Sequence, residues 1–471
     1  MTRLGNLALG LLLLQAAASA NGEAAPEVIQ RDVIVLGGGS SGTYAAVRLQ
    51  QLGKSVALVE KAGRLGGHTN TYVDARTGKT FDYGTQNFVN TTEVYNYFRS
   101  LGVPLAPFAP KRRSVAVDMA RERPGPPWPV VGANDTAAAL ARYKVQLAKY
   151  PDDFFRGYHL PDPVPEDLLL PWGGFIQKYD LGALAYDGWL RFQGMGNVLA
   201  QPTLYIMKLF NPMQVKARED NSKVYQADDD LQSLWNAAQA FLGDSAVTSA
   251  EVGRVDRQGD GVTVSLTTPS GPKTVRASKI LITIPPTLDN LEPFLDLSDE
   301  ESRIFGQLNN SYYYNAVISR SGFPARTSVY SYDLESQYGI PAMPGVYSFN
   351  TETVSDLWST QYTSPHYQSE ETVKATILAQ VHQARRALGQ PGEAQGNDGG
   401  PEIVAFNNHS PFGLTVSTDA IRSGFYKCYT ALQGQRNTFW TGHSWSSGSS
   451  STIWDFTEYE VLPAITASLG G

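Results

Sequence analysis

Residues 33–60 read VIVLGGGSSGTYAAVRLQQLGKSVALVE. Val33–Leu36 is a continuous apolar run, which is typical of a strand buried on both faces of a parallel sheet. It leads into a G-x-G-x-x-G turn over residues 37–42, a segment with a helical apolar stripe, and a second apolar run that ends at Glu60. The stretch therefore predicts a β-α-β unit that begins a parallel sheet, and an α/β fold.

Each glycine of this turn has a separate physical reason. Gly37 permits the tight turn, Gly39 lets a pyrophosphate approach the backbone, and Gly42 allows the helix to pack closely on the strand. Ser41 lies at the start of the helix, where free N–H groups attract phosphate. Glu60 follows Gly42 by 18 residues, a spacing that places its carboxylate near ribose hydroxyls. Because strand, turn, helix and acid are in register, a dinucleotide site is favoured over a plain glycine loop.

A second glycine pair follows directly. Residues 60–67, EKAGRLGG, resemble the E-x-x-x-R-x-G-G continuation of the flavin amine oxidase superfamily. The resemblance implies that Gly66 and Gly67 pass close to the cofactor, since only a residue without Cβ lets the backbone come so near. It adds Lys61 and Arg64 to the expected site. FAD rather than NAD is the expected cofactor.

Further segments match the order of the same superfamily. Asp82–Gly84 resembles its D-x-G strand end near the isoalloxazine ring. His68 stands where an arginine often follows the glycine pair, and it would donate to a phosphate or ribityl oxygen; a histidine packed on the turn is the alternative. Residues 251–284 predict a three-stranded meander followed by a buried strand. In the superfamily the backbone before this meander contacts the adenine, which implies Val247.

The C-terminal region resembles the last flavin motif of the superfamily. Residues 438–443, TFWTGH, predict a strand that enters a tight turn at Gly442. His443 stands where the family has an acid that binds the ribityl chain. The helix that follows contributes Ile453 and Trp454, and its N-terminal N–H groups would stabilise negative charge on the flavin. Trp454 as a plain core residue is the alternative.

These pieces predict a Rossmann-like FAD-binding domain with an inserted α+β substrate domain, the architecture of the flavin amine oxidases. The FAD-binding domain is discontinuous, over residues 30–105, 224–295 and 401–471. The substrate domain takes residues 106–223 and 296–400.

The substrate domain is rich in aromatic residues. Nine tyrosines fall between residues 311 and 367. Such stripes are usual in cores, but an aromatic wall against a flavin suits a hydrophobic or aromatic metabolite better than a small polar amine. Many amine oxidases have a lysine facing the flavin, whereas this chain has none between Lys279 and Lys374.

Across residues 31–471 the order of motifs resembles a secreted fungal branch of flavin-dependent oxidoreductases. The resemblance implies that a substrate C–H bond loses hydride to the flavin, in one member with ring closure. Oxygen or another acceptor then reoxidises the cofactor. Three other readings stay open: an isomerase or cyclase without net redox, an amine oxidase that releases hydrogen peroxide, and a binding protein with a degenerate flavin site.

The sequence offers few candidates for a catalytic base. His409 is the first candidate, although a surface histidine beside a glycosylated loop is an equal alternative. Tyr314 is the second, as a pocket hydroxyl. Cys428 precedes Gly442 by only 14 residues, fewer than the covalent flavin link of monoamine oxidases needs, so non-covalent FAD is expected.

Composition and charge exclude several classes of function. A net charge of −7 argues against nucleic acid, because no excess of basic residues neutralises phosphates. The six histidines form no H-x-x-x-H group and the single cysteine makes no thiolate site, so no metal is expected.

The N-terminal residues predict a secretory route. The apolar run Leu4–Leu14 precedes Ala18-Ser19-Ala20, which predicts a signal peptide over residues 1–20. The run is too short to span a bilayer, and no later stretch is long enough. A secreted or ER-luminal protein is therefore expected. N-glycosylation sequons stand at Asn90, Asn134, Asn309 and Asn408.

Overall fold

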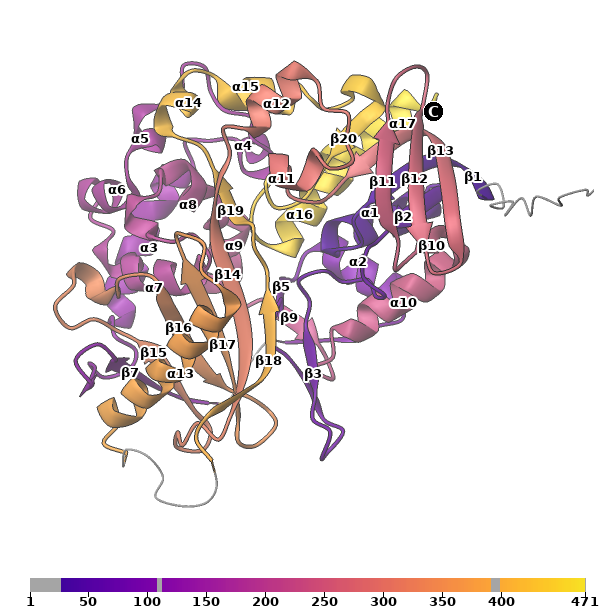
Figure 1. Cartoon of the computed structure of the whole chain (residues 1–471). Coiled ribbons are helices and arrows are strands. Elements are labelled where there is room, and N and C mark those ends of the chain that lie inside the picture. The colour runs from indigo at the N-terminus through magenta and orange to yellow at the C-terminus, as the bar shows by residue number, and fades with distance from the viewer. Residues whose placement is uncertain (1–26, 108–111, 391–398, 471) are drawn as a thin grey trace, which may run out of the picture.

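The computed structural model describes residues 27–107, 112–390 and 399–470 (Figure 1). The expected signal peptide over residues 1–20 lies outside this part of the chain. The described residues form two large β-sheets with helices around them. The chain crosses between the sheets more than once, as the colours of Figure 1 show.

The first sheet has the strand order β10-β2-β1-β13-β12-β11, and β20 also pairs with β13. Its strands are β1 (Glu27–Leu36), β2 (Val56–Val59), β10 (Ala246–Val247), β11 (Glu251–Asp256), β12 (Val262–Thr268), β13 (Gly271–Ile282) and β20 (Thr438–Trp440). The apolar runs of the sequence form its centre, and Val33–Leu36 and Val56–Val59 are buried throughout. The expected parallel sheet is therefore confirmed.

The β-α-β unit at the start of the chain takes the expected form. Helix α1 (Ser40–Gln51) connects β1 to β2, which pair in parallel from Val33 with Val56 to Leu36 with Val59. Tyr44, Val47 and Leu49 of α1 are buried against the sheet.

Strand β13 changes partner along its length. Its first half pairs antiparallel with β12, which completes the expected meander with β11. Its last residues, Ile280–Ile282, pair in parallel with Thr438–Trp440 of β20. Because β20 takes the place beside β13 that β12 leaves, the C-terminal strand joins the parallel centre of the sheet.

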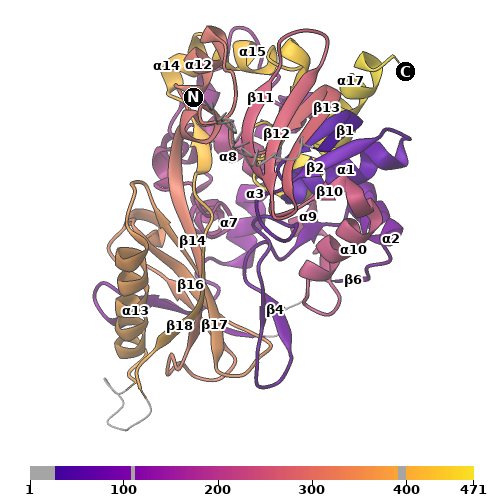
Figure 2. The same cartoon turned by 45° about the vertical axis from the view of Figure 1, so that its right-hand side comes forward.

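The second sheet has the order β18-β14-β17-β16-β15-β7-β8, and β19 pairs with β14. Its strands are β7 (Arg113–Asp118), β8 (Arg123–Pro124), β14 (Asn309–Ser319), β15 (Thr327–Ser331), β16 (Gly345–Thr351), β17 (Leu357–Ser364), β18 (Glu402–Asn408) and β19 (Phe412–Thr415). Helix α13 (Glu370–Ala387) covers one face, where a separate apolar core includes Val373, Ile377 and Val381 (Figure 2).

The sheet membership of β18 and β19 differs from the predicted domain boundary. The sequence assigns residues 401–471 to the FAD-binding domain, but β18 and β19 pair with β14 of the second sheet. The change from one sheet to the other therefore comes after Thr415. Hydrogen-bond pairing between segments almost a hundred residues apart leaves no local mark on the sequence.

A group of short helices lies beside the second sheet on the face away from α13 (Figure 1). They are α3 (Ala133–Leu147), α4 (Asp152–Arg156), α5 (Glu166–Leu169), α6 (Trp172–Lys178), α7 (Ala185–Arg191), α8 (Thr203–Leu209) and α9 (Pro212–Glu219). Trp189 of α7 packs on Tyr347 of β16, with ring centroids 4.9 Å apart. The aromatic residues expected to line a substrate pocket thus also join these helices to the second sheet.

The remaining elements surround the first sheet and connect the two. The helices are α2 (Thr92–Ser100), α10 (Gln232–Leu242), α11 (Leu288–Leu291), α12 (Asp299–Phe305), α14 (Thr418–Arg422), α15 (Phe425–Thr430), α16 (Ser450–Phe456) and α17 (Leu462–Ser468). The strands are β3 (Thr71–Val73), β4 (Thr80–Asp82), β5 (Phe88–Val89), β6 (Leu105–Pro107) and β9 (Lys223–Gln226). Within the described residues, no helix has the length and apolar character needed to cross a membrane.

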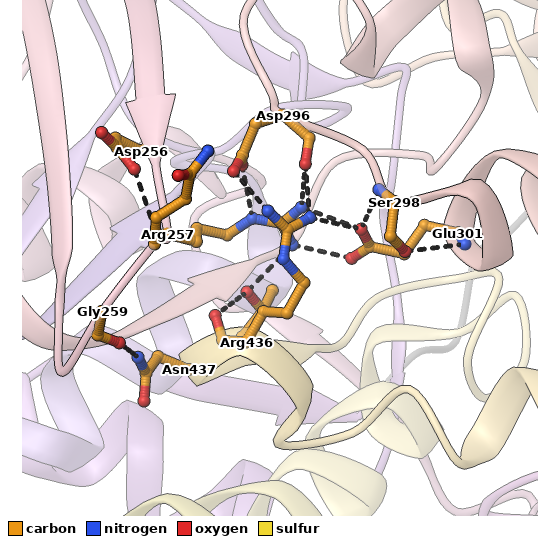
Figure 3. Close-up of polar contacts among 10 residues, drawn as sticks. Asp256, Arg257, Gly259, Asp296, Ser298, Glu301, Arg436 and Asn437 are labelled. Atoms are coloured by element: carbon orange, nitrogen blue, oxygen red, sulfur yellow. Dashed lines mark hydrogen bonds and ion pairs between the residues drawn. The ribbon is translucent and has the colours of Figure 1, made fainter.

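A buried arginine joins three of these segments (Figure 3). Arg257 follows β11, and its side chain is fully buried. Its guanidinium donates to both carboxylate oxygens of Glu301, at 2.7 and 2.9 Å, to the carboxylate and backbone oxygens of Asp296, and to the Thr438 hydroxyl. Every N–H group of the guanidinium thus has an acceptor. Arg436 also contacts Asp296 and Glu301.

This network fixes the start of β20. Burial would raise the pKa of Glu301, but hydrogen bonds and charge from Arg257 outweigh that effect and hold the pKa below its usual range. Glu301 also accepts from the backbone N–H of Ser298, as part of the capping box predicted for α12. The loop before β20 is therefore tied to β11 and α12.

Candidate active site

Five strands of the first sheet end at one edge. These strands are parallel, so their carboxyl ends meet there. The residues that follow them are Gly37, Glu60, Thr248, Thr283 and Thr441. The carboxyl edge of an open α/β sheet is where such folds place their ligands. Most of the residues predicted to bind FAD therefore lie at this edge.

The glycines of the first turn have different surroundings. A Cβ on Gly42 would lie 1.9 Å from the carbonyl oxygen of Gly37, so only glycine fits there. A Cβ on Gly37 would lie 2.6 Å from the hydroxyl of Thr283. At Gly39 the nearest atom to such a Cβ is the Cα of Gly67, 3.9 Å away. The outer side of Gly39 therefore faces open space at the start of α1, as a phosphate cradle requires.

The second glycine pair crosses directly over the first turn. The N–H of Gly66 donates to the carbonyl of Gly38 at 2.8 Å. A Cβ on Gly67 would lie 2.8 Å from the Cα of Gly39, and a Cβ on Gly66 would meet the Trp235 ring at 2.6 Å. Both glycines are thus required by contact with their neighbours. The sequence indicates the close approach but not that Trp235 of α10 causes part of it.

The side chain of Glu60 binds the backbone of the first turn. Its two carboxylate oxygens accept from the backbone N–H groups of Gly38 and Ala62, both at 2.7 Å. The Glu60 backbone N–H donates to Val247 of β10 at 3.0 Å. A carboxylate oxygen has a second acceptor position, so a ribose hydroxyl can still donate to it. Val247, the expected adenine contact, is thus next to the expected ribose contact.

Lys61 and Arg64 differ in their surroundings. Lys61 is exposed. Arg64 is held by the protein, because its guanidinium donates to Gln232 at 2.8 Å and to the amide oxygen of Asn70 at 3.1 Å. Arg64 therefore supports the segment that follows Gly67.

The structure brings together three histidines from distant parts of the chain. The rings of His68 and His409 are stacked, with centroids 4.2 Å apart and an angle of 7° between their planes. The ring centroid of Phe412 lies 6.2 Å from that of His68 and 4.8 Å from that of His443. The ring centroids of Tyr313 and Phe412 are 4.8 Å apart. We call His68, His409, His443, Phe412 and Tyr313 the histidine cluster.

The three imidazoles of the histidine cluster are neutral at pH 7. Burial lowers the pKa of His68 to about 4. Burial, with a smaller contribution from His68, lowers the pKa of His443 to about 4. Burial and the neighbouring His68 and Arg64 lower the pKa of His409 well below its usual range. His68 is nevertheless in contact with solvent. Solvent therefore reaches the His68 ring although protein atoms surround it closely.

Tyr314 does not face the histidine cluster. It lies in the apolar core under α13, where its hydroxyl donates to the backbone carbonyl of Gln368 at 3.3 Å. Its neighbours Tyr313 and Asn315 point to the other face of β14 and contact Gln193 and His409. The expectation of a pocket hydroxyl at Tyr314 is thus not met, because successive strand residues face opposite sides.

The C-terminal motif lies next to the first turn. Gly442 has φ +117°, and a Cβ there would lie 3.1 Å from the carbonyl of Thr283. Ile453 and Trp454 are buried in α16. The Trp454 ring stacks on Tyr44 of α1 at 4.8 Å, and its indole N–H donates to Ser40 at 3.1–3.2 Å. Trp454 therefore packs on the start of α1, as its core alternative predicts.

Three contributors to the site were missed in the sequence. Phe412 and Asn70 have no pattern that marks them, although Asn70 falls two residues after His68. Asn315, next to Tyr314 on β14, likewise has no pattern that marks it. Within the described ranges, no group of histidine, cysteine and carboxylate side chains has the arrangement of a metal site.

Asp82, at the end of β4, is almost wholly buried. Its carboxylate accepts from the backbone N–H of Leu231 at 2.9 and 3.1 Å and from the Thr71 hydroxyl. Burial, with a smaller contribution from Asp229, raises the pKa of Asp82 to about 7. Asp82 therefore titrates near neutral pH beside the segment that carries Tyr83 and Gly84.

This raised pKa predicts a pH dependence of stability. The folded state keeps a proton on Asp82 that the unfolded state releases near its ordinary pKa of about 4. The contribution of this proton to the free energy of unfolding is therefore complete below pH 4. It is lost as the pH rises toward 7, and it amounts to at most about 4 kcal/mol. Asp82→Asn removes this titration. The urea midpoint of the variant should therefore fall less between pH 4.5 and pH 7.5 than the urea midpoint of the wild type. Exposed Asp260→Asn is the control. Equal losses in wild type and Asp82→Asn would contradict the assignment.

Known proteins of similar sequence are flavin-dependent oxidoreductases. The sequence pattern of the family described as flavin containing amine oxidoreductase matches residues 40–325. The FAD-dependent oxidoreductase oblC of Cochliobolus heterostrophus is 36% identical over 460 residues, which cover 94% of this chain and 92% of that protein. Beta-cyclopiazonate dehydrogenase of Aspergillus flavus is 32% identical over 466 residues, 98% of each chain.

Solved structures show the same fold. A fatty acid isomerase from P. acnes has a TM-score of 0.74 at 20% identity, over 92% of this chain and 98% of that one. Putrescine oxidase with bound putrescine has a TM-score of 0.62 at 17% identity, over 93% and 99%. At these identities the likeness concerns the fold alone.

Proposed function

The chain belongs to the flavin-containing amine oxidoreductase family, and we propose that it oxidises a hydrophobic small molecule at a C–H bond. The family makes it an FAD-dependent oxidoreductase, which confirms the cofactor expected from the glycine pairs. The observation that carries the proposal is the histidine cluster, in which neutral imidazoles and aromatic rings lie beside the glycine pair Gly66-Gly67.

We assign the FAD contacts to residues of this edge. The backbone of Gly37–Gly42, including Ser41, would hold the diphosphate at the start of α1. Glu60 would accept the adenosine ribose hydroxyls, and Val247 would contact the adenine. The other end of the cofactor would extend past Gly67 toward His68 and His443. FAD bound in this way supplies a ring that accepts hydride from the substrate.

The protein's own part is to enclose and orient the substrate. The histidine cluster offers neutral imidazoles and aromatic rings, with the amides of Asn70 and Asn315 behind them. None of these groups provides a counter-charge for an ammonium group, so a neutral, hydrophobic or aromatic metabolite fits better than a simple amine. Oxygen or another acceptor would reoxidise the cofactor.

The relatives support a role in making a specialised metabolite, since one is named as a dehydrogenase of beta-cyclopiazonate. Secretion is part of the same proposal. Sequon residues Asn90, Asn134, Asn309 and Asn408 are all exposed, as glycosylation requires.

Purified protein is expected to be yellow and to release intact FAD on mild heat or acid. With the oxidised metabolite's precursor under anaerobic conditions, the flavin band bleaches without any added acceptor. A rearranged product formed without bleaching would contradict oxidation and indicate an isomerase. Flavin that stays on the precipitated chain would contradict non-covalent binding and implicate Cys428.

Glu60→Gln should weaken FAD binding at least tenfold. The substitution removes the negative charge from hydrogen bonds that are worth about 1.5–3 kcal/mol each when charged, and every 1.4 kcal/mol is a factor of ten. It also sets an amide NH₂ against one of the N–H groups of Gly38 and Ala62. Titration of the apoprotein with FAD measures the affinity, and its unfolding midpoint shows whether the turn survives. An unchanged affinity would remove Glu60 from the cofactor site.

A further inference from the structure

His409, the first candidate for a catalytic base, is enclosed by amides. It follows β18 directly and is only 4% exposed. Its Nε2 lies 2.7 Å from the amide nitrogen of Asn70, and its Nδ1 lies 3.2 Å from the amide nitrogen of Asn315. A neutral imidazole has one N–H and one lone pair, so it cannot accept from two amide NH₂ groups. One of the two amides must therefore present its oxygen.

The orientation of Asn70 is fixed by its other contacts. Its oxygen accepts from Arg64 at 3.1 Å, and a guanidinium can only donate. Its nitrogen lies 3.3 Å from the backbone carbonyl of His68, which can only accept. Asn70 therefore donates to Nε2 of His409. The Nε2 atom uses its lone pair in this contact, and the ring proton of His409 must be on Nδ1.

Asn315 is the amide that turns. Its oxygen is buried without a hydrogen-bond partner among the described residues, while its nitrogen faces Nδ1 of His409. Exchanging the oxygen and the nitrogen gives Nδ1–H an acceptor and gives the oxygen a donor, while the amide NH₂ takes the position at which the oxygen had no partner. Both ring nitrogens of His409 are then occupied, so this histidine has no lone pair for a substrate proton.

His68 has the opposite surroundings. No side-chain hydrogen bond of His68 occurs within the described part of the chain, and solvent reaches it. Its ring lies flat against His409, at 4.2 Å. The rigid ring of His409 thus fixes the plane of the His68 ring, whose nitrogens remain available to a ligand.

We propose that Arg64, Asn70, His409 and Asn315 form a hydrogen-bonded chain that holds His409 as its Nδ1–H tautomer, so that His409 positions His68 toward the flavin. The proposal rests on the FAD site assigned above. It makes His409 a positioning residue and His68 the imidazole that donates to the cofactor. The earlier expectation of a base at His409 is replaced.

The tautomer is tested by nitrogen NMR of the FAD-loaded protein labelled with ¹⁵N-histidine, which contains only six histidines. The His409 signals are assigned by their loss in His409→Leu. We expect a neutral Nδ1–H ring between pH 5.5 and pH 8. Asn315→Asp keeps an acceptor at Nδ1 and keeps this tautomer, whereas Asn70→Asp replaces the donor at Nε2 and abolishes it. Asn310→Asp, on the same strand, is the control. An Nε2–H ring in the wild type, or no change in Asn70→Asp, would overturn the inference.

The positioning role is tested by FAD affinity in a double-mutant cycle. His68→Leu and His409→Leu should each weaken FAD roughly two- to tenfold, the value of one hydrogen bond. If His409 acts through His68, the double variant is no weaker than His68→Leu alone. Effects that multiply would overturn the positioning role. A wild-type chain that binds no FAD would instead contradict the proposed function, and its histidine spectrum could still be read.

Discussion

Gly39→Val is expected to abolish FAD binding and to leave the apoprotein folded. The backbone of Gly39 is extended, with φ −69° and ψ −175°, so valine fits there without strain. Among the described residues other than its two chain neighbours, one heavy atom lies within 4 Å of the added Cβ, the Cα of Gly67 at 3.9 Å, so the side chain enters the open side of the turn. That side is where the diphosphate must approach the N–H groups of α1. The loss should exceed a hundredfold in affinity, about 2.7 kcal/mol.

Two other glycines make this result specific. Gly174→Val adds the same side chain on α6 at a point where no atom from the other described segments lies within 4 Å of the Cβ, and it should keep FAD. Gly42→Ala places a Cβ 1.9 Å from a backbone oxygen and should prevent correct folding altogether. FAD content and circular dichroism of the three purified variants separate these outcomes. A Gly39→Val protein with one FAD per chain would show that the cofactor binds elsewhere.

Arg257→Met should lower the free energy of unfolding by about 3–5 kcal/mol. Methionine replaces the aliphatic part of the arginine side chain but leaves the buried carboxylate of Glu301 without its bidentate partner. Removing one partner of a buried ion pair destabilises a protein by about this amount. The start of β20 also loses its contact through Thr438. Lower FAD occupancy should follow, since β20 leads to Gly442 and His443.

Lys144→Met is the matched control. It removes a lysine that pairs with Glu219, but both side chains are well exposed, so the pair contributes little. Urea unfolding of the apoproteins, with FAD absent from all samples, measures the difference. Equal losses for the two variants would contradict a structural role for the buried network.

The sequence predicted the first β-α-β unit well because each of its features has one physical explanation. An apolar run buried on both faces, a glycine turn and an acid at fixed spacing have no common alternative. The face of β14 was harder to predict. Three tyrosines stand in a row before Asn315, so no alternation of apolar and polar residues shows which of them faces the site. A shift of one residue exchanges the two faces of a strand.

Contacts between distant segments explain what the sequence could not show. His68, His409 and His443 were each singled out, but only the pairing of β18 with β14 brings His409 onto His68. The same pairing moves the domain boundary past Thr415. The tautomer of His409 depends on Asn70 and Asn315, two amides with no motif of their own.

A crystal structure of the FAD-loaded protein tests the central claim most directly. We expect the diphosphate at the backbone of residues 37–42, the adenosine ribose on Glu60, and the flavin ring at the histidine cluster with His68 within hydrogen-bond distance of the cofactor. FAD bound in the reverse direction, or away from the turn at residues 37–42, would contradict the account.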